Sequence, residues 1–400
     1  YMKELQQQFN AQWKGRKDPF KDYQQLLDQG IKRSDRYRQL QTLGRTELEI
    51  QQDFLTPARM TIFSWKGDID TLMRPIDSIK YYKLLLRNAL MSMEPQTGHV
   101  KAWVGGTNFE YFKYDQVKTG TRQVGSTAKP FTYAVAIDNG YSPCLTVPNE
   151  PVEIEGWTPN AYKPLPGSIT LKRALAYSQN YVTAYMMKQV GATAVSTLIK
   201  KMGVTSDVPA YPSICLGTFD ASVYDMVGAY SAFVNHGTWT EPIYLLRIED
   251  KNGNMLYERK PKVVFALNEQ TAYVMTQMLK GVVENGTGSR LRYKYGLTNP
   301  IGGKTGTTQN NSDGWFMGIT PQLVTGVWTG CEDRAIHFFS TNQGEGANSA
   351  LPIFALYMKK VYADGKLKYS KGDFEPPKGE QTITFDCDTY ANPPATVEEN

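Results

Sequence analysis

The stretch "GSTAKPF" places a serine, Ser126, three residues before a lysine, Lys129, where a helix is expected to begin. Residues three apart share one face of a helix, so the amine can approach the hydroxyl. A lysine with a lowered pKa can take the serine proton and create a nucleophile, and the helix N-terminus adds positive potential. S-x-x-K alone is a weak signal, although it occurs once in this chain. The alternative is that Ser126 caps the helix and Lys129 is solvated.

A second serine, Ser178, stands two residues before Asn180 in "AYSQNYV", between two helical patterns. In a tight connection both side chains can point into one cleft, where Ser178 would relay a proton and Asn180 would hold a substrate amide and Lys129. Local capping is the alternative for both residues. S-x-N says little by itself, because another copy stands at Ser340 to Asn342.

The tetrapeptide "KTGT" occurs twice, and its second copy spans residues 304–307. This copy follows two glycines and precedes two predicted strands, so we expect a strand whose small residues leave one face open to an extended peptide. Lys304, Thr305 and Thr307 would then hold a terminal carboxylate. The N–H of Thr307 would join the N–H of Ser126 in an oxyanion hole.

The first KTGT copy, residues 118–121, lies only a few residues before Ser126. It would have to fold back within that gap to face its own serine, so we expect an exposed loop or strand end. The order S-x-x-K, S-x-N, KTG carries more information than any one motif. The gaps between the motifs leave room for a helical block and then a strand.

The composition argues against several other chemistries. The chain has 44 basic and 39 acidic residues, a formal charge of +5, and no stretch basic enough to indicate nucleic acid binding. Three histidines and four cysteines are widely spaced, so we expect no structural zinc site, no Ser-His-Asp triad and no metal. The cysteines allow a long-range disulfide without deciding whether one forms. No run approaches the ~18 apolar residues of a membrane span.

The elements that must position these residues follow a clear order. Alternating segments around "PQTG" predict a hairpin, and helical patterns follow from Ser126 to about residue 237. A long amphipathic helix, a strand pair and a last helix are then expected at 268–286, 315–329 and 346–362. This order indicates an α+β fold, in which an antiparallel β-sheet is packed with helices and an all-helical subdomain is added.

Three regions are expected along the chain. Residues 1–85 form a smaller N-terminal linker region, which begins with exposed helices rich in Gln, Lys and Arg. Residues 86–371 form the main domain, and residues 372–400 form a loose C-terminal extension rich in Pro, Glu and Thr. The opening "YMKELQQQFNAQW" lacks an initiator Met, so we expect a mature protein or a piece of a longer one.

With its motifs in this order, the chain resembles the transpeptidase domain of a class A, bifunctional penicillin-binding protein, in the serine D,D-transpeptidase and β-lactamase-like superfamily. The resemblance covers roughly residues 86 to 362 and rests on "MEPQTGHVKAWVGG", "RQVGSTAKPF", "SQN", "AYSAFVNHG", "GGKTGTT", "DGWFMGITPQLVTGVWTG" and "ALPIFALYMKK". One departure is Gln179, where many class A enzymes carry Arg and many β-lactamases Asp; as a spacer, it would affect subtype more than chemistry.

The resemblance implies a role for each motif residue. Ser126 would be the acylated nucleophile and Lys129 its general base. Ser178 and Asn180 would serve proton relay and substrate binding. The substrate-binding strand would consist of Lys304, Thr305, Gly306 and Thr307.

The implied reaction is acyl transfer on peptidoglycan stem peptides that end in D-Ala-D-Ala, on glycan strands made from lipid-linked precursors. β-Lactams would acylate Ser126, and neither a metal nor an organic cofactor would be needed. The family's glycosyltransferase domain and membrane anchor are not in this sequence, so residues 1–85 would be the linker after them. The implied location is the extracytoplasmic face of the bacterial cytoplasmic membrane.

Four alternatives stay open. A D,D-carboxypeptidase would pass the acyl group to water. A class A β-lactamase would need a Glu-activated water, and "PNEPVEIEGW" lies before the expected place for that residue. A β-lactam sensor would share Ser126 and Lys129 without turnover, and a structural wall-binding module would need neither.

Overall fold

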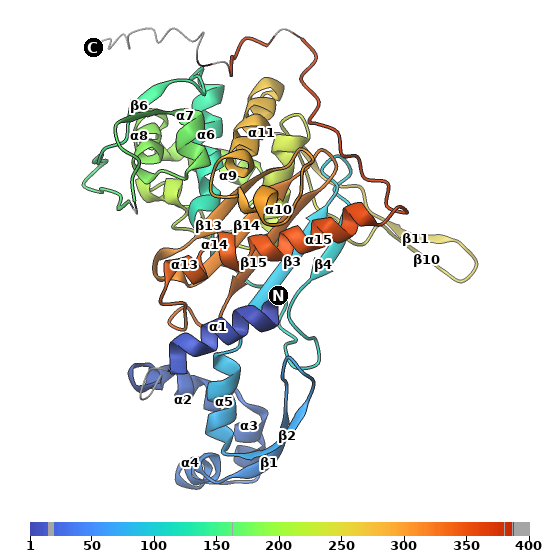
Figure 1. Cartoon of the computed structure of the whole chain (residues 1–400). Helices are drawn as coiled ribbons and strands as arrows, with labels where there is room; N and C mark the ends of the chain where they lie inside the picture. Colours follow the sequence, from blue (N-terminus) through green and yellow to red (C-terminus); the bar gives the residue numbers. More distant parts are fainter. Residues whose placement is uncertain (15–19, 162, 380, 386, 388–400) are drawn as a thin grey trace.

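The centre of the molecule is a five-stranded sheet, seen in the computed structural model, which describes residues 1–14, 20–161, 163–379, 381–385 and 387 (Figure 1). All neighbouring strands are antiparallel. Their order across the sheet is β13 (Gly302–Thr307), β14 (Asp313–Ile319), β15 (Val324–Gly330), β3 (Arg87–Met93) and β4 (Val100–Val104). The predicted hairpin is β3–β4 and the predicted strand pair is β14–β15, which confirms the α+β class.

Helices cover both faces of this sheet. On one face lie α10 (Val223–Val234) and α11 (Glu269–Glu284), and on the other lie α14 (Gly346–Ser349) and α15 (Leu351–Ala363). Successive side chains of β14 point to opposite faces of the sheet and so contribute to both cores. Trp315 and Met317 belong to the core on the α10 side, while Phe316 packs on Phe354 with ring centroids 4.9 Å apart. The sheet is therefore buried on both sides, which holds β13 in a fixed place at its edge.

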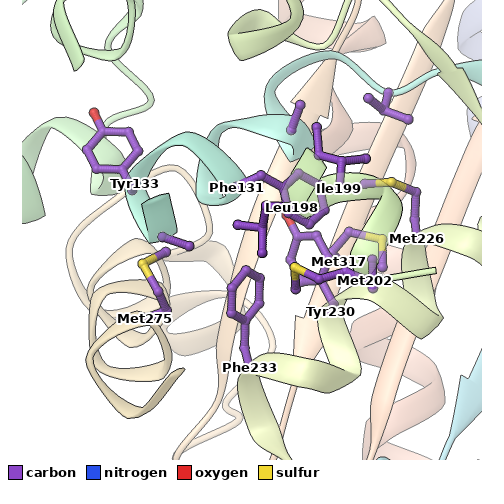
Figure 2. Packing of buried hydrophobic residues seen from close by; sticks show 14 of the residues in the cluster. Phe131, Tyr133, Leu198, Ile199, Met202, Met226, Tyr230, Phe233, Met275 and Met317 are labelled. Atoms are coloured by element: carbon purple, nitrogen blue, oxygen red, sulfur yellow. The ribbon is translucent and has the colours of Figure 1, made fainter. Parts of the chain in front are cut away.

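A helical subdomain lies beside the sheet and forms the largest core. Figure 2 shows Phe131, Tyr230 and Phe233 packed with Leu198, Ile199 and several methionines. The Phe131 and Tyr230 rings meet edge to face at 5.9 Å. The helices are α6 (Lys129–Asp138), α7 (Leu171–Ala176), α8 (Asn180–Val190), α9 (Ala192–Lys201) and the 3-10 helices η2 (Gly125–Ala128) and η3 (Pro212–Leu216).

Short elements complete the main domain. They include the projecting hairpin β10–β11, with Asn252 and Gly253 in its turn (Figure 1). The bounds are β5 (Arg122–Gln123), β6 (Thr146–Pro148), β7 (Ser168–Thr170), β8 (Asp220–Ala221), β9 (Thr238–Thr240), β10 (Arg247–Glu249), β11 (Met255–Glu258), β12 (Val263–Phe265), α12 (Arg290–Tyr293), η4 (Gln309–Asn311) and α13 (Thr341–Gly344).

The N-terminal region is helical with one hairpin. Our expectation of exposed helices is wrong for the first of them, because Leu5, Phe9 and Trp13 are buried against residues 331–338 after β15. The spacing of four places all three on one helical face. The elements are α1 (Met2–Lys14), η1 (Lys21–Tyr23), α2 (Gln24–Arg33), α3 (Asp35–Thr42), α4 (Glu47–Leu55), β1 (Ala58–Ile62), β2 (Ile69–Met73) and α5 (Pro75–Lys83). Domain boundaries near residues 85 and 371 stay predictions.

The C-terminal extension differs from the loose tail that we expected. In its described part, Phe374 is buried, and Phe385 packs on the core of the helical subdomain. Cys387 forms a disulfide with Cys144, just before β6. The extension is therefore attached to the domain at both ends of its described course. Among the described residues, no helix is long and apolar enough to cross a membrane.

Candidate active site

Ser126 lies in the 3-10 helix η2, which leads directly into α6. The side chain is half-buried, and it lines the main cleft of the molecule. The Tyr230 hydroxyl donates to Thr127 O at 2.6 Å, which attaches η2 to α10. The helix predicted from Ser126 thus begins there as a 3-10 turn, fixed from beneath by a buried tyrosine.

Lys129 is fully buried one turn further on. Its Nζ donates to Asn180 Oδ1 at 2.6 Å, to Ser178 Oγ at 3.2 Å and to Ser178 O. In the described part of the chain, no hydrogen bond joins Ser126 Oγ to Lys129 Nζ. Burial lowers the pKa of Lys129 to about 7, against a smaller opposite effect of Cys215. The amine is therefore easily deprotonated near neutral pH, as a general base requires.

Ser178 and Asn180 come from the tight connection between α7 and α8. Ser178 has a φ of +55°, a left-handed conformation that is uncommon for a residue with a side chain and often found at functional sites. Asn180 begins α8, and its Nδ2 donates to Asn160 O at 2.5 Å. That bond orients the amide so that Oδ1 faces Lys129.

Lys304 reaches the same cluster from β13, at the edge of the sheet. Its side chain is fully buried, and Nζ donates to Ser178 Oγ at 2.8 Å and to Thr305 O at 3.1 Å. Burial, followed by the positive charge of Lys129, lowers the pKa of Lys304 well below its ordinary value. The Ser178 hydroxyl therefore lies between two lysines from different elements, which suits a proton relay.

The backbone of Thr307 lies against the turn that carries Ser126. A Cβ on Gly125, which has a φ of +54°, would lie 2.9 Å from Thr307 O. Thr308 N donates to Asp313 O on β14. Because N–H groups alternate along a strand, the Thr307 N–H points to the free edge of β13. The expected oxyanion donors on Ser126 and Thr307 thus lie on adjoining segments.

The cleft has a volume of about 850 Å³ and lies between β13, η2 and the loop 149–167. Thr305 and Thr307 line it together with Ser126 and Ser178. Its one lining carboxylate among the described residues is Glu345, which pairs with Arg290 at 3.0 Å. The cleft accordingly presents hydroxyls, amides and one ion pair to an extended ligand.

The first KTGT copy lies elsewhere. Lys118 is in an exposed turn, with Nζ 4.7 Å from the centroid of the Tyr224 ring and its N–H bonded to Asp115. The second S-x-N sequence forms the start of α13, with Ser340 as the N-cap and Asn342 exposed in the first turn. The structure thus brings together all eight predicted site residues and leaves Lys118 outside their cluster.

Gln179 has a structural role that sequence reasoning missed when it treated the residue as a spacer. The side chain is buried, and its Oε1 accepts from Asn149 Nδ2 at 2.8 Å and from Leu165 N at 2.9 Å. These two donors belong to the loop 149–167, which also supplies Asn160 to Asn180. Gln179 thus links the loop over the cleft to the motif beneath it.

Replacing Gln179 with alanine should loosen this loop. Two buried donors would lose their acceptor, which costs about 1–3 kcal/mol in the free energy of unfolding. We expect the reactivity of Ser126 toward an acylating reagent to fall about fivefold, since roughly 1 kcal/mol of lost positioning corresponds to that factor. Gln179→Glu keeps the acceptor oxygen but replaces the donor to Tyr177 O with a second acceptor, so its values should fall between those of wild type and the alanine variant. Thermal unfolding and acylation kinetics measure both effects; an alanine variant with wild-type values in each would refute the role.

Comparison with known proteins defines the class. Residues 89–329 match the family described as penicillin-binding protein transpeptidase domain, and residues 10–86 match the penicillin-binding protein middle domain. The chain therefore belongs to the penicillin-binding protein transpeptidase family, which is a class of serine acyltransferases and peptidases in peptidoglycan synthesis.

Within this family, the chain is similar to the class A proteins named penicillin-binding protein 1A and 1B. It is 34% identical over 299 residues to penicillin-binding protein 1A of Aquifex aeolicus, covering 73% of this chain and 40% of the relative. It is 31% identical over 309 residues to penicillin-binding protein 1A of Rickettsia conorii, covering 70% of this chain and 38% of the relative. The chain thus spans about two fifths of the length of these relatives.

Solved structures share the fold. The crystal structure of penicillin-binding protein 1A from Haemophilus influenzae superposes with a TM-score of 0.65 at 23% identity, over 78% of this chain and 51% of that chain. The structure of the PonA1 protein from Mycobacterium tuberculosis in complex with penicillin V gives a TM-score of 0.61 at 22% identity. The match covers 92% of this chain and 99% of that chain. This architecture is therefore a penicillin-binding protein transpeptidase fold.

Proposed function

We propose that this chain is a peptidoglycan D,D-transpeptidase that cross-links stem peptides through an acyl-enzyme on Ser126. The observation that carries the proposal is the convergence of Lys129 and Lys304, both fully buried, on the Ser178 hydroxyl beside Ser126. Burying two amines in one cluster costs free energy, and buried groups with shifted pKa values are found most often at functional sites. Family membership supports the same reaction class.

In the first step, Ser126 Oγ attacks the carbonyl carbon between the two D-alanines. Lys129 takes the hydroxyl proton after a rotation of the Ser126 side chain, because the resting amine bonds to Ser178 and Asn180 instead. The N–H groups of Ser126 and Thr307 stabilise the oxyanion. The C–N bond then breaks, the Lys304–Ser178–Lys129 path returns a proton to the leaving nitrogen, and D-Ala departs.

In the second step, an amine of a neighbouring stem attacks the ester. The amine loses a proton to Lys129, a new amide bond forms, and Ser126 Oγ regains its proton. The donor lies extended along β13, where Lys304, Thr305 and Thr307 hold its terminal carboxylate and Gly306 leaves room for its backbone. β-Lactams imitate the donor, in line with the penicillin V complex of the PonA1 protein.

We also propose an extracytoplasmic location, with a glycosyltransferase domain and a membrane anchor in the full-length protein. The disulfide between Cys144 and Cys387 supports this location, because disulfides persist in oxidising compartments. The glycan strands would come from lipid-linked precursors made at the same membrane surface.

The alternative reactions differ in what removes the acyl group. A D,D-carboxypeptidase would use water, and this activity is the main competitor. A β-lactamase would need a carboxylate to activate that water, and Glu345, already paired with Arg290, is the one carboxylate among the described lining residues. Glu150, Glu153 and Glu155, in the stretch considered earlier, are exposed and outside the cleft lining.

Intact-mass spectrometry after incubation with penicillin G tests the acyl-enzyme. We expect one penicillin per chain, on the peptide that contains Ser126, and slow release. An adduct on any other residue would contradict the assignment. Rapid conversion of all penicillin to the hydrolysed acid would favour a β-lactamase.

The acylation rate should depend on pH through Lys129. A general base acts when it is neutral, and its pKa is about 7. The rate should therefore rise as pH increases from about 6 to 8 and then level off, since deprotonation is complete about one unit above the pKa. Stopped-flow labelling at constant ionic strength measures the profile, with thermal unfolding at each pH as a control on folding. A rate that is flat across this range would exclude Lys129 as the titrating base.

A further inference from the structure

The helix α1 lies along the back of one wall of the cleft. We call residues 336–348 the wall segment. Its cleft side supplies His337, Phe338, Phe339, Thr341, Glu345 and Ala347 to the cleft lining. Its other side faces α1, which lies beneath α13 in Figure 1. No motif in the sequence pointed to this arrangement.

Polar contacts join α1 to the wall segment along its length. Phe339 N donates to Gln12 Oε1 at 2.8 Å, and Trp13 Nε1 donates to His337 O at 3.2 Å. The Gln12 amide also bonds to Gln343, and the Tyr1 hydroxyl, just before α1, donates to Asn348 O. The segment is therefore held at both of its ends and in the middle by side chains of α1 and of the residue just before it.

Apolar contacts add to this attachment. The ring of Phe9 meets that of Phe338 edge to face, with centroids 4.9 Å apart, and Trp13 lies 4.9 Å from Phe339. Phe338 is buried although it belongs to the cleft lining. One surface of each aromatic residue thus rests on α1 while the segment itself borders the cleft.

From the wall segment, contacts continue to the substrate-binding strand. Gly346 N donates to Thr307 Oγ1 at 3.1 Å, and a Cβ on Gly346 would lie 2.3 Å from Gly306 O. Glu345 holds Arg290 at the same end of the cleft. A displacement of the segment would therefore move Thr307, whose N–H is one of the two oxyanion donors of the proposed function.

We infer that α1 is a positioning element for acyl transfer, with Gln12 as its central positioning residue acting through Phe339 and the wall segment on Thr307. The inference rests on the proposed function. Its physical basis is that the wall segment is short and irregular, so its place depends on contacts with its neighbours. Changes in the region before the transpeptidase domain would then alter the acylation rate without touching the cleft.

The test uses the whole chain with Gln12→Ala, Gln12→Glu and, as a matched control on the same helix, Gln7→Ala, since Gln7 is exposed. Stopped-flow penicillin G acylation gives the rate at saturation and the dissociation constant separately. We expect Gln12→Ala to lower the saturating rate about tenfold, the equivalent of one lost part-buried hydrogen bond, with an unchanged dissociation constant. Gln12→Glu keeps the acceptor for Phe339 N and should recover most of the rate, and Gln7→Ala should match wild type.

The possible outcomes distinguish failure of this inference from failure of the proposed function. If wild type reacts with penicillin and Gln12→Ala reacts equally fast at saturation, α1 does not position the site. Equal losses in Gln12→Ala and Gln7→Ala would also overturn the inference, because they would indicate general destabilisation of the helix. If wild type itself forms no adduct, the proposed function fails first.

Discussion

Replacing Ser126 with alanine is expected to abolish covalent labelling by penicillin, with a loss of at least ~10³-fold in the acylation rate. The variant lacks the oxygen that forms the ester in the proposed mechanism, and the other hydroxyl at Lys129, Ser178 Oγ, is held by hydrogen bonds from both buried lysines. The fold should be unaffected, because Ser126 is half-buried and its hydroxyl has no hydrogen bond within the described residues. Gel fluorescence with a labelled penicillin measures the loss.

Two controls make this result decisive. Thermal unfolding of Ser126→Ala should agree with wild type within about 1 °C, which for a chain of this size corresponds to about 1 kcal/mol. Ser340→Ala, in the second S-x-N sequence, should label normally. Persistent labelling of Ser126→Ala would mean that another residue is the nucleophile, and the mechanism proposed here would be wrong.

The second large effect distinguishes the two identical tetrapeptides. Lys304→Ala should slow acylation by about 10³-fold, because it removes the buried donor to Ser178 and, in the proposed function, one of the groups that hold the substrate carboxylate. Lys118→Ala should change the rate less than twofold, because Lys118 is an exposed residue that stacks over Tyr224, an interaction worth about 0.5–1 kcal/mol to stability at an exposed site. Stopped-flow labelling compares the two variants directly.

The two lysines are a matched pair because each is followed by the same three residues, Thr-Gly-Thr. Circular dichroism and thermal unfolding confirm that each variant is folded. Lys304→Met, which preserves the apolar stem in the buried site, provides a variant with less effect on packing and should be as slow as Lys304→Ala. Similar rates for the Lys304 and Lys118 variants would overturn the assignment of the catalytic copy.

The order of the motifs was enough to predict much of the site. Ser126 and Lys129 sit on adjoining turns as their spacing requires, and Lys304 lies on an edge strand as its glycines and following strands indicated. The amine of Lys129, which we expected to approach the Ser126 hydroxyl, makes no hydrogen bond to it in the described structure. Helical spacing fixes the distance between the two Cα atoms, but it does not fix where a long lysine side chain finds its hydrogen-bond acceptors. Here tertiary packing places Ser178 and Asn180 within reach of Nζ.

The features that could not be predicted from the sequence depend on contacts between segments far apart in the chain. Gln179 looked like a spacer because its partners lie in a loop with no regular pattern. The pairing of Cys144 with Cys387 depends on the path of a Pro-rich extension. Burial of α1 had a signal, the four-residue spacing of its apolar side chains, but nothing local identifies the surface that covers them.

The most direct test of the proposed transpeptidase follows the acyl group from donor to acceptor. Wild type and Ser126→Ala would each be given a stem peptide ending in D-Ala-D-Ala, together with a second stem that carries a free amine, and products would be separated by mass. We predict a cross-linked dimer with wild type and none with Ser126→Ala. Release of D-Ala without dimer, at every acceptor concentration tested, would contradict the transpeptidase and identify a carboxypeptidase.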